Sequence, residues 1–251
     1  MEQGYAIQNQ GDRRIVTIGS SKYSTKYSET IIQAIVSRKG VSRLHQYLEH
    51  KDSRSSYLKP LFRYLDQNGA KNLRVLEVGC STGHITEYLH EQKCISEIYA
   101  FDVDKGLVDV AILKKHELGL NKVKRLDVFT NQESKALPYE DNFFDLVIAL
   151  AVLEHLPYEN RHEYVDNYYQ KLKIGGLIGF FETPNRHFPF EKHTVGLPFI
   201  AKMSPHLAYI YSRVCGKSRG LSFQTFIRPD TGWRNSSYYE CHPRAVMVDI
   251  E

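Results

Sequence analysis

The middle of the chain shows five short apolar runs at regular intervals, each long enough for one β-strand. They lie at 75–78, 98–101, 123–126, 146–150 and 177–181. The stretches between them have the length of helices, and strands that alternate with such stretches are typical of βαβ units. The pattern therefore predicts an α/β fold with a doubly wound, mostly parallel sheet.

Two helices inside this alternating region are marked by their apolar faces. One face consists of Leu107, Val108, Val110, Ala111 and Leu113, and the other of Tyr164, Val165, Tyr168, Tyr169 and Leu172. Gly175 and Gly176 follow the second face and are predicted to end that helix, because glycine is favoured just beyond a helix C-terminus.

A further helical pattern precedes the predicted sheet, between Ser28 and Gln67. Its apolar residues recur at steps of three and four, and they are Ile31, Ile32, Ala34, Ile35, Leu44, Tyr47, Leu48, Leu58, Leu61, Phe62 and Leu65. Gly40 and residues 52–56 separate this pattern into shorter helices.

The predicted organisation has four parts. Residues 1–22 are polar and aperiodic and are expected to be a flexible N-terminal arm. Residues 23–70 form a helical cover, and residues 71–185 form the core domain. Residues 186–251 supply a loop, a lid-like segment and the closing strands, with 245–250 as the last strand.

The residues that end the predicted strands carry the candidate chemistry, because ligands of open α/β sheets bind outside the carboxyl ends of the strands. The first strand runs into Glu77-Val-Gly-Cys-Ser-Thr-Gly-His84. Gly79 and Gly83 allow the backbone to turn tightly and to approach a ligand closely. The turn is not a dinucleotide fingerprint, because Ser81 replaces the middle glycine and the last glycine falls one place early.

Acidic residues end the next two strands. A carboxylate at Asp102 can accept hydrogen bonds from both hydroxyls of a ribose. Asp127, which precedes Val128, is placed to face an adenine amino group. Each feature alone also fits a structural role, since an acid after a strand often caps the next helix.

Together these features occur in one order: VLEVGCSTGHITEYL, IYAFDVD, LDV and LPYEDNFFDLVIALAVLEHLP. In this respect the chain resembles the class I S-adenosylmethionine-dependent methyltransferases. Within that class it is most similar to the group of the ubiquinone-biosynthesis O-methyltransferases and their bacterial type 11 relatives. The resemblance runs from about residue 74 to residue 185. It implies a methyltransferase, S-adenosylmethionine as the cofactor, and a Rossmann-like seven-stranded sheet whose last strand is antiparallel.

The resemblance also implies which residues hold the cofactor. Gly79 would lie along its methionine part, Asp102 at its ribose, Asp127 at its adenine, and Leu150 in the pocket lining. The full predicted set is Glu77, Gly79, Cys80, Ser81, Gly83, Asp102, Val103, Asp127, Val128 and Leu150. Two of these depart from the family pattern, since Glu77 stands where aspartate is commoner and Ser81 where glycine is usual.

Methyl transfer needs little from the protein beyond holding acceptor and methyl group in line and excluding water. A base helps only where the acceptor is a hydroxyl that loses its proton. The candidate bases are His155, after the fourth strand, and His193, in the loop after the fifth. A histidine that packs a short helix and a loop histidine without a role fit these positions as well. No metal site is predicted, because the spacing of His187, Glu191 and His193 matches no standard one.

The acceptor is expected to be a small molecule or a saccharide, methylated on oxygen. No Asn/Asp-Pro-Pro-Tyr motif and no cysteine follows the fourth strand, which argues against DNA and against covalent pyrimidine chemistry. The loop after the fifth strand resembles one in bacterial methyltransferases of glycans and other cell-surface precursors. Residues 186–244 hold nine Lys/Arg against three acids, which fits either a solvated face or a site for an anionic acceptor or surface.

Residues 197–216 are apolar and aromatic with a few cations. This composition fits helices that pack over the sheet, a lid over the acceptor, or an interfacial patch that approaches a lipid-linked substrate. Peripheral membrane contact therefore stays open, as does the oligomeric state.

The composition also bears on the cellular location of the protein. The 251 residues are 42% hydrophobic and 25% charged, with a net charge of +4. No apolar run approaches the roughly 18–20 residues that cross a bilayer, and the N-terminus lacks the layout of a secretory signal. The four cysteines lie far apart in the sequence, which indicates free thiols in a reducing compartment. A cytoplasmic protein without a transmembrane segment is predicted.

Two other functions fit the same pattern. A non-catalytic methyltransferase-like module would share the fold and act through a partner, but it need not retain Asp102 or the turn at 79–83. The hypothesis of an RNA-modifying methyltransferase rests only on the basic segment 186–244, and it predicts salt-sensitive binding of RNA.

Overall fold

The computed structural model describes most of the chain, which divides into two compact units. The described residues are 4–48, 54–156, 160–182, 196–200, 203–218, 220 and 222–226. The first unit contains the described residues up to Gln132 together with Phe144–Leu146. The second contains Glu133–Phe143 and the described residues from Val147 onward.

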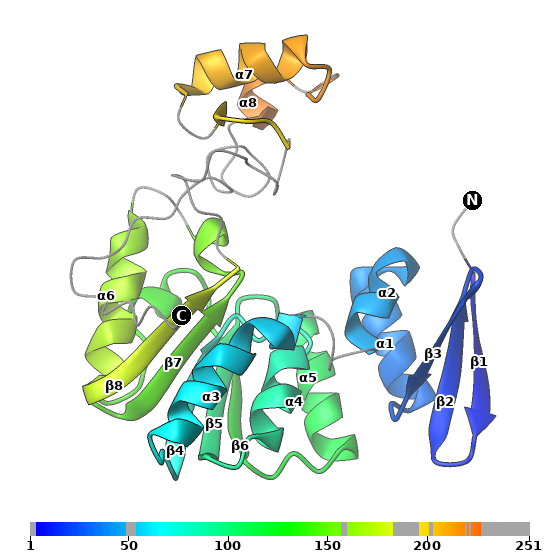
Figure 1. Ribbon diagram of the computed structural model, residues 1–251, viewed down its shortest axis with the longest axis vertical. Helices are drawn as coiled ribbons and strands as arrows, with labels where there is room; N and C mark the ends of the chain where they lie inside the picture. The colour runs from blue at the N-terminus through cyan, green and yellow to red at the C-terminus, as the bar shows by residue number, and fades with distance from the viewer. Residues whose placement is uncertain are drawn as a thin grey trace. The chain divides into compact units, whose positions relative to one another are not determined.

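The main sheet has five strands in the order β6-β5-β4-β7-β8 (Figure 1). The strands are β4 Leu73–Val78, β5 Ile95–Asp102, β6 Val123–Val128, β7 Phe144–Leu150 and β8 Leu172–Phe181. β5 pairs in parallel with both β4 and β6. All five predicted apolar runs lie in these strands, so the α/β fold class is confirmed.

The predicted count of seven strands is not confirmed. The described residues supply five strands to this sheet, and the predicted closing strand at 245–250 lies outside them. The seven-stranded sheet therefore stays a prediction.

Three helices of the first unit lie on the same face of its strands (Figure 1). They are α3 Lys59–Gln67, α4 His84–Glu91 and α5 Lys105–Glu117. The Asp104 carboxylate begins α5, because it accepts hydrogen bonds from the N–H groups of Gly106 at 2.8 Å and Leu107 at 3.2 Å. The apolar face predicted for this segment is thus on a helix, whose Val108, Val110 and Ala111 are buried.

The helical pattern near the N-terminus is also confirmed. It forms α1 Glu29–Lys39, α2 Val41–Leu48 and the 3-10 helix η1 Arg54–Leu58. The Ser28 side chain caps α1 by accepting from the Ile31 N–H at 3.1 Å. Gly40, at φ +77°, ends α1 where the pattern predicted a break.

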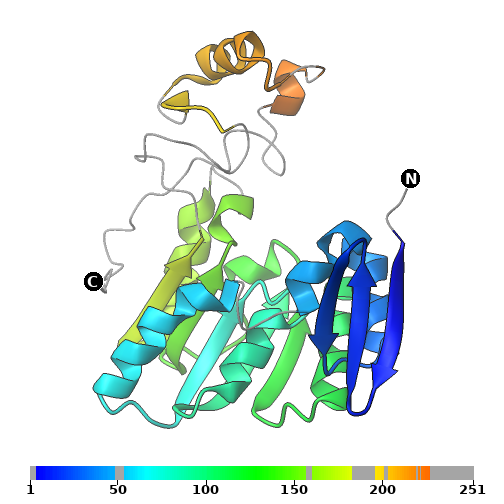
Figure 2. The same cartoon turned by 45° about the vertical axis from the view of Figure 1, so that its right-hand side comes forward.

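Residues 5–25 form a three-stranded antiparallel sheet, so the predicted flexible arm is wrong (Figure 2). Its strands are β1 Tyr5–Gln10, β2 Arg13–Ile18 and β3 Ser21–Thr25. Val16 of β2 is fully buried in one apolar cluster with Ile31 and Ile35 of α1 and Val110 of α5. This sheet thus belongs to the core of the first unit.

Residues 5–25 form a sheet because they contain two hairpins with two-residue loops. Gly11-Asp12 joins β1 to β2, and Gly19-Ser20 joins β2 to β3. Both glycines have positive φ, as the turns that match the strand twist require. Val16 and Thr25 are the buried residues of these strands and the others are partly or fully exposed, so a composition that suggests a loose arm is that of a half-exposed sheet.

A buried polar cluster ties the segment after β3 to α4 and α5. The Tyr27 hydroxyl donates to Glu87 Oε2 at 2.6 Å, and Lys114 Nζ donates to the Tyr27 hydroxyl at 3.0 Å. Lys114 and Glu87 are fully buried, with 3.8 Å between Nζ and Oε2. Lys26 Nζ approaches Glu87 Oε1 at 3.1 Å from the surface.

The second unit contributes the rest of the helices. They are the 3-10 helices η2 Glu133–Lys135 and η3 Leu153–His155, and the α-helices α6 Arg161–Lys171, α7 Pro205–Val214 and α8 Phe223–Phe226. None of the helices in the described part of the chain is both long and apolar enough to cross a bilayer.

The end of α6 differs from the prediction. The helix ends at Lys171, and Gly175 and Gly176 lie inside β8 instead of ending the helix. Leu172 already has extended backbone angles, φ −83° and ψ 135°. The Lys171 carbonyl accepts from the Phe143 N–H at 2.9 Å, so it is satisfied without a glycine cap.

Candidate cofactor site

Residues 79–83 form a tight turn between β4 and α4. Gly79, Ser81 and Gly83 all have positive φ, at 74°, 48° and 73°. The N–H groups of Gly79 and Cys80 both donate to the Phe101 carbonyl at 2.9 Å. The turn is therefore fixed to the end of the neighbouring strand β5.

Gly83 is required by packing as well as by backbone conformation. A Cβ atom at this position would lie 3.0 Å from the Cβ and 3.2 Å from the Cα of Ala111 on α5. The sequence analysis explained this glycine by the close approach of a ligand. The structure shows that it also allows the close approach of α5. Any side chain here would displace α5 or deform the turn.

Asp102 ends β5 and joins the turn to the start of the next connection. Its Oδ2 accepts from the Ser81 N–H at 2.8 Å, and its Oδ1 accepts from the Asp104 N–H at 3.0 Å. A carboxylate oxygen accepts more than one hydrogen bond. The Asp102 carboxylate can thus hold the two backbone segments and still accept from the hydroxyls of a ribose.

Asp127 lies beside the end of β5, on β6. In the parallel register it is opposite Phe101, and Val128 is opposite Asp102. Arg125 Nη2 lies 3.0 Å from Asp127 Oδ1. Val103 and Val128 are 53% and 41% exposed, so two apolar side chains stand at the surface where the two strands end.

Cys80 is buried in the turn. Burial raises the pKa of the Cys80 thiol, and the nearby charges of Glu77, Asp102 and Asp127 raise it further. The thiol therefore stays protonated and is unsuited to nucleophilic chemistry.

Glu77 is buried at the end of β4. Thr86 of α4 donates its hydroxyl to Glu77 Oε2 at 2.6 Å. Burial raises the pKa of Glu77 to about 7; the Asp102 charge adds to this effect, and the Thr86 hydrogen bond opposes it. Its carboxyl group is therefore partly protonated at neutral pH.

The raised pKa predicts a pH dependence of stability. The folded chain holds a proton on Glu77 more tightly than the unfolded chain does, so stability should fall as the pH rises from about 5 to about 8. We expect Glu77→Gln to remove about 3 kcal/mol of this fall. Urea unfolding of both proteins across this range measures it.

The control is Glu117→Gln, because Glu117 is exposed at the end of α5. It should show the same fall as the unaltered chain. A Glu77→Gln variant whose stability also falls as in the unaltered chain would show that Glu77 does not titrate in this range.

Two hydroxyl groups in the turn fit a polar ligand. Ser81 Oγ and Thr82 Oγ1 are buried and have no hydrogen-bond partner among the described residues. Buried polar atoms in proteins are normally satisfied by protein, water or ligand. Together with the lone pairs of Asp102 and Asp127, they make a donor and acceptor set that fits the amino acid, ribose and adenine parts of S-adenosylmethionine.

The first unit therefore brings together nine of the ten predicted cofactor residues, on the ends of β4, β5 and β6. The tenth, Leu150, is the buried last residue of β7 and belongs to the second unit. Sequence reasoning missed Thr86, although a threonine between buried Ile85 and Leu89 on one helix is a signal for an internal hydrogen bond.

The two candidate bases lie outside the described part of the first unit. His155 is exposed, ends η3 and lies in the second unit. His193 lies outside the described residues, as do His187 and Glu191. Within the described residues, no group of three or more potential metal ligands occurs.

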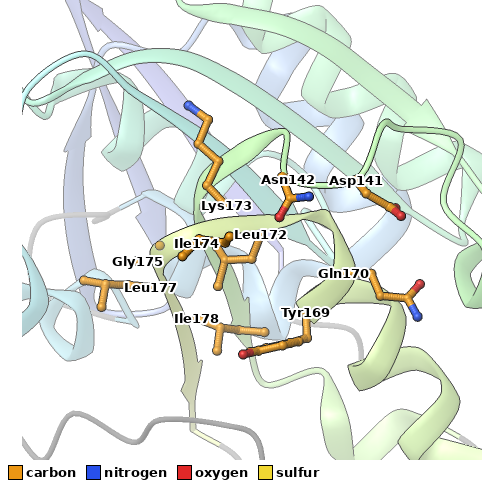
Figure 3. A pocket seen from close by; sticks show the side chains of 11 residues that line it. Asp141, Asn142, Tyr169, Gln170, Leu172, Lys173, Ile174, Gly175, Leu177 and Ile178 are labelled. Atoms are coloured by element: carbon orange, nitrogen blue, oxygen red, sulfur yellow. The ribbon is translucent and has the colours of Figure 1, made fainter.

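A pocket of about 460 Å³ lies in the second unit, around the first half of β8 (Figure 3). It is lined by Asp141, Asn142, Tyr169, Gln170, Leu172, Lys173, Ile174, Gly175, Gly176, Leu177 and Ile178. Leu172 begins β8, and Asn142 lies just before β7 begins. The pocket is therefore at the amino ends of these strands, whereas ligands of open α/β sheets bind at the carboxyl ends.

Comparisons with known proteins agree with the site. Residues 76–180 match the family described as methyltransferase domain. The ubiquinone biosynthesis O-methyltransferase of Histophilus somni is 28% identical over 155 residues, which cover 60% of this chain and 63% of that protein. The malonyl-[acyl-carrier protein] O-methyltransferase of Bacillus cereus is 28% identical over 109 residues, which cover 43% of this chain and 37% of that protein.

Among solved structures, a SAM-dependent methyltransferase from Aquifex aeolicus has 20% sequence identity and a TM-score of 0.44, with 76% of this chain and 89% of that chain covered. The chain spans less than two thirds of the length of the two curated relatives.

The family match begins within β4 and includes β5, β6 and β7, and thus every residue of the turn and both strand-end aspartates. The family match and the O-methyltransferase relatives indicate one cofactor. Residues 76–180 thus match a methyltransferase domain, and S-adenosylmethionine is the cofactor of the class I methyltransferases that this part of the chain resembles.

Proposed function

We propose that this chain is an enzyme that transfers the methyl group of S-adenosylmethionine to an oxygen atom of a small molecule or a saccharide. The observation that carries the proposal is the Asp102 carboxylate, which holds the glycine turn at 2.8 Å and retains lone pairs for a ribose. The choice of oxygen rests on the relatives, since both curated proteins described above are O-methyltransferases.

The residues of the first unit would act by binding and orientation. Asp102 would accept from the ribose hydroxyls and Asp127 from the adenine amino group, while Val103 and Val128 would pack on the adenine ring. The exposed position of these two valines supports this role, because a ring laid on them removes apolar surface from water. S-adenosylmethionine supplies the activated methyl group when bound.

A test of the function uses methyl-labelled S-adenosylmethionine and fractions of a cell extract. We expect label to appear in one small-molecule or saccharide fraction, on oxygen, and Asp102→Ala to abolish it. Label on nitrogen or on RNA would contradict the proposed acceptor. Cofactor binding without any transfer would support a non-catalytic module instead.

A hydroxyl acceptor requires a base, and we propose His193 for this role. Removing a general base lowers the rate by about a hundredfold or more and leaves cofactor binding intact. His193→Ala should therefore lower turnover on the labelled acceptor about a hundredfold, with unchanged affinity for S-adenosylmethionine. His155→Ala serves as the comparison, and the same loss in that variant alone would assign the base to His155.

A further inference from the structure

One face of α7 carries large apolar side chains that are exposed. Leu207, Ile210 and Val214 are 59%, 57% and 81% exposed. With about 3.6 residues per turn, these three positions fall within an arc of about 60° and form one continuous stripe. Phe199, which is 54% exposed, adds apolar surface just before the helix. Single exposed apolar residues are common on proteins, but an apolar stripe along a helix indicates a contact surface.

The opposite face fixes the orientation of the helix. Ala208 is buried in a small apolar cluster with Leu197 and Ile200. Ser212, one turn further along, is buried and lies 2.6 Å from the Ser218 hydroxyl. The buried face of α7 is thus satisfied by its own neighbours, and the apolar stripe faces away from them.

The charge of the segment that contains α7 indicates the kind of surface that α7 fits. Residues 192–229 contain six Lys/Arg and no Asp or Glu. Arg213 and Lys217 are exposed and flank Val214 in sequence. An apolar stripe beside cations, without any acid, is the pattern of a helix that lies in the interface of an anionic bilayer. A second copy of this chain would bring like charges together, which disfavours self-association through this face.

We infer that α7 docks on anionic lipid membranes. Leu207, Ile210 and Val214 enter the interface between headgroups and acyl chains, and Arg213 and Lys217 contact the lipid phosphates. A short helix with three inserted side chains gives weak, reversible binding that depends on negative lipid charge. The inference does not depend on methyl transfer, because membrane binding is measured without a substrate.

The experiment is flotation of the full chain with vesicles made of equal parts phosphatidylglycerol and phosphatidylcholine. We expect the chain to float with these vesicles, and to do so much less with phosphatidylcholine alone or at high salt. Changing Leu207, Ile210 and Val214 together to serine should weaken binding by about tenfold or more. Arg213→Glu with Lys217→Glu should weaken it by a similar factor, because each cation near the surface contributes about fivefold.

The matched control is Ile174→Ser, which removes an apolar side chain that is 98% exposed on β8. It should float as the unaltered chain does, and each variant should retain the circular dichroism spectrum and S-adenosylmethionine affinity of the parent. Absence of flotation, or equal flotation of the triple variant, would overturn the inference. The inference would also be overturned if the chain did not bind vesicles but formed concentration-dependent dimers that the triple variant abolished.

Discussion

Replacing Asp102 with alanine should weaken S-adenosylmethionine binding by about a hundredfold or more. Two hydrogen bonds from the ribose to a carboxylate are worth about 3 kcal/mol together, which corresponds to about that factor in affinity. The substitution also removes the acceptor of the Ser81 and Asp104 N–H groups, so the turn loses one of its attachments to the end of β5. Isothermal titration calorimetry measures the change.

Asp109→Ala is the matched control. Asp109 is another acid of the first unit, exposed on α5, where its carboxylate pairs with Lys105 at 2.8 Å. We expect this variant to bind the cofactor as the unaltered chain does, because an exposed pair on a helix contributes little. Unchanged affinity in Asp102→Ala would remove the basis for placing the ribose at this carboxylate.

Replacing Glu87 with alanine should destabilise the chain by about 3–5 kcal/mol. Glu87 is fully buried, and its carboxylate accepts from the Tyr27 hydroxyl at 2.6 Å. Burial lowers the pKa of Lys114 to about 8, against the opposing effect of the Glu87 charge. Without Glu87 the buried ammonium of Lys114 loses its nearest negative charge and must be neutralised or hydrated. Urea unfolding followed by circular dichroism measures the loss.

A second variant separates the buried charge from the lost packing. Glu87→Gln combined with Lys114→Met keeps the shape of both side chains and removes both charges, so it should recover most of the lost stability. If the double variant is as unstable as Glu87→Ala, the loss comes from packing or from the Tyr27 hydroxyl and not from the unpaired charge.

The core of the first unit was predictable because each of its signals is local. The apolar runs of β4, β5 and β6 are short and bounded by turn residues, and Gly79 and Asp102 follow directly after their strands. Strand ends in a parallel sheet share one edge, so these local signals are sufficient to define a site. The N-terminal sheet is also encoded locally, in the loops Gly11-Asp12 and Gly19-Ser20, but its polar composition is that of a loose segment and masks these hairpin signals.

Other features depend on contacts between distant residues and could not be predicted in this way. The need for glycine at position 83 comes from Ala111 on another helix. Lys114 looks like a surface lysine in sequence, and its burial is explained by two residues far away in the chain, the Tyr27 hydroxyl at 3.0 Å and the Glu87 carboxylate at 3.8 Å. The end of α6 differs from the prediction for a similar reason, because the Phe143 N–H satisfies the Lys171 carbonyl and the helix needs no glycine cap.

The central claim is that the turn after β4 and the acid that ends β5 bind one adenosyl ligand. A crystal structure of the chain with S-adenosylhomocysteine, the demethylated cofactor, tests this most directly. We expect the ribose hydroxyls to lie about 2.5–3.0 Å from the Asp102 carboxylate oxygens, with the adenine amino group at Asp127. A complex in which the ligand binds elsewhere and leaves Asp102 without a contact would contradict the account.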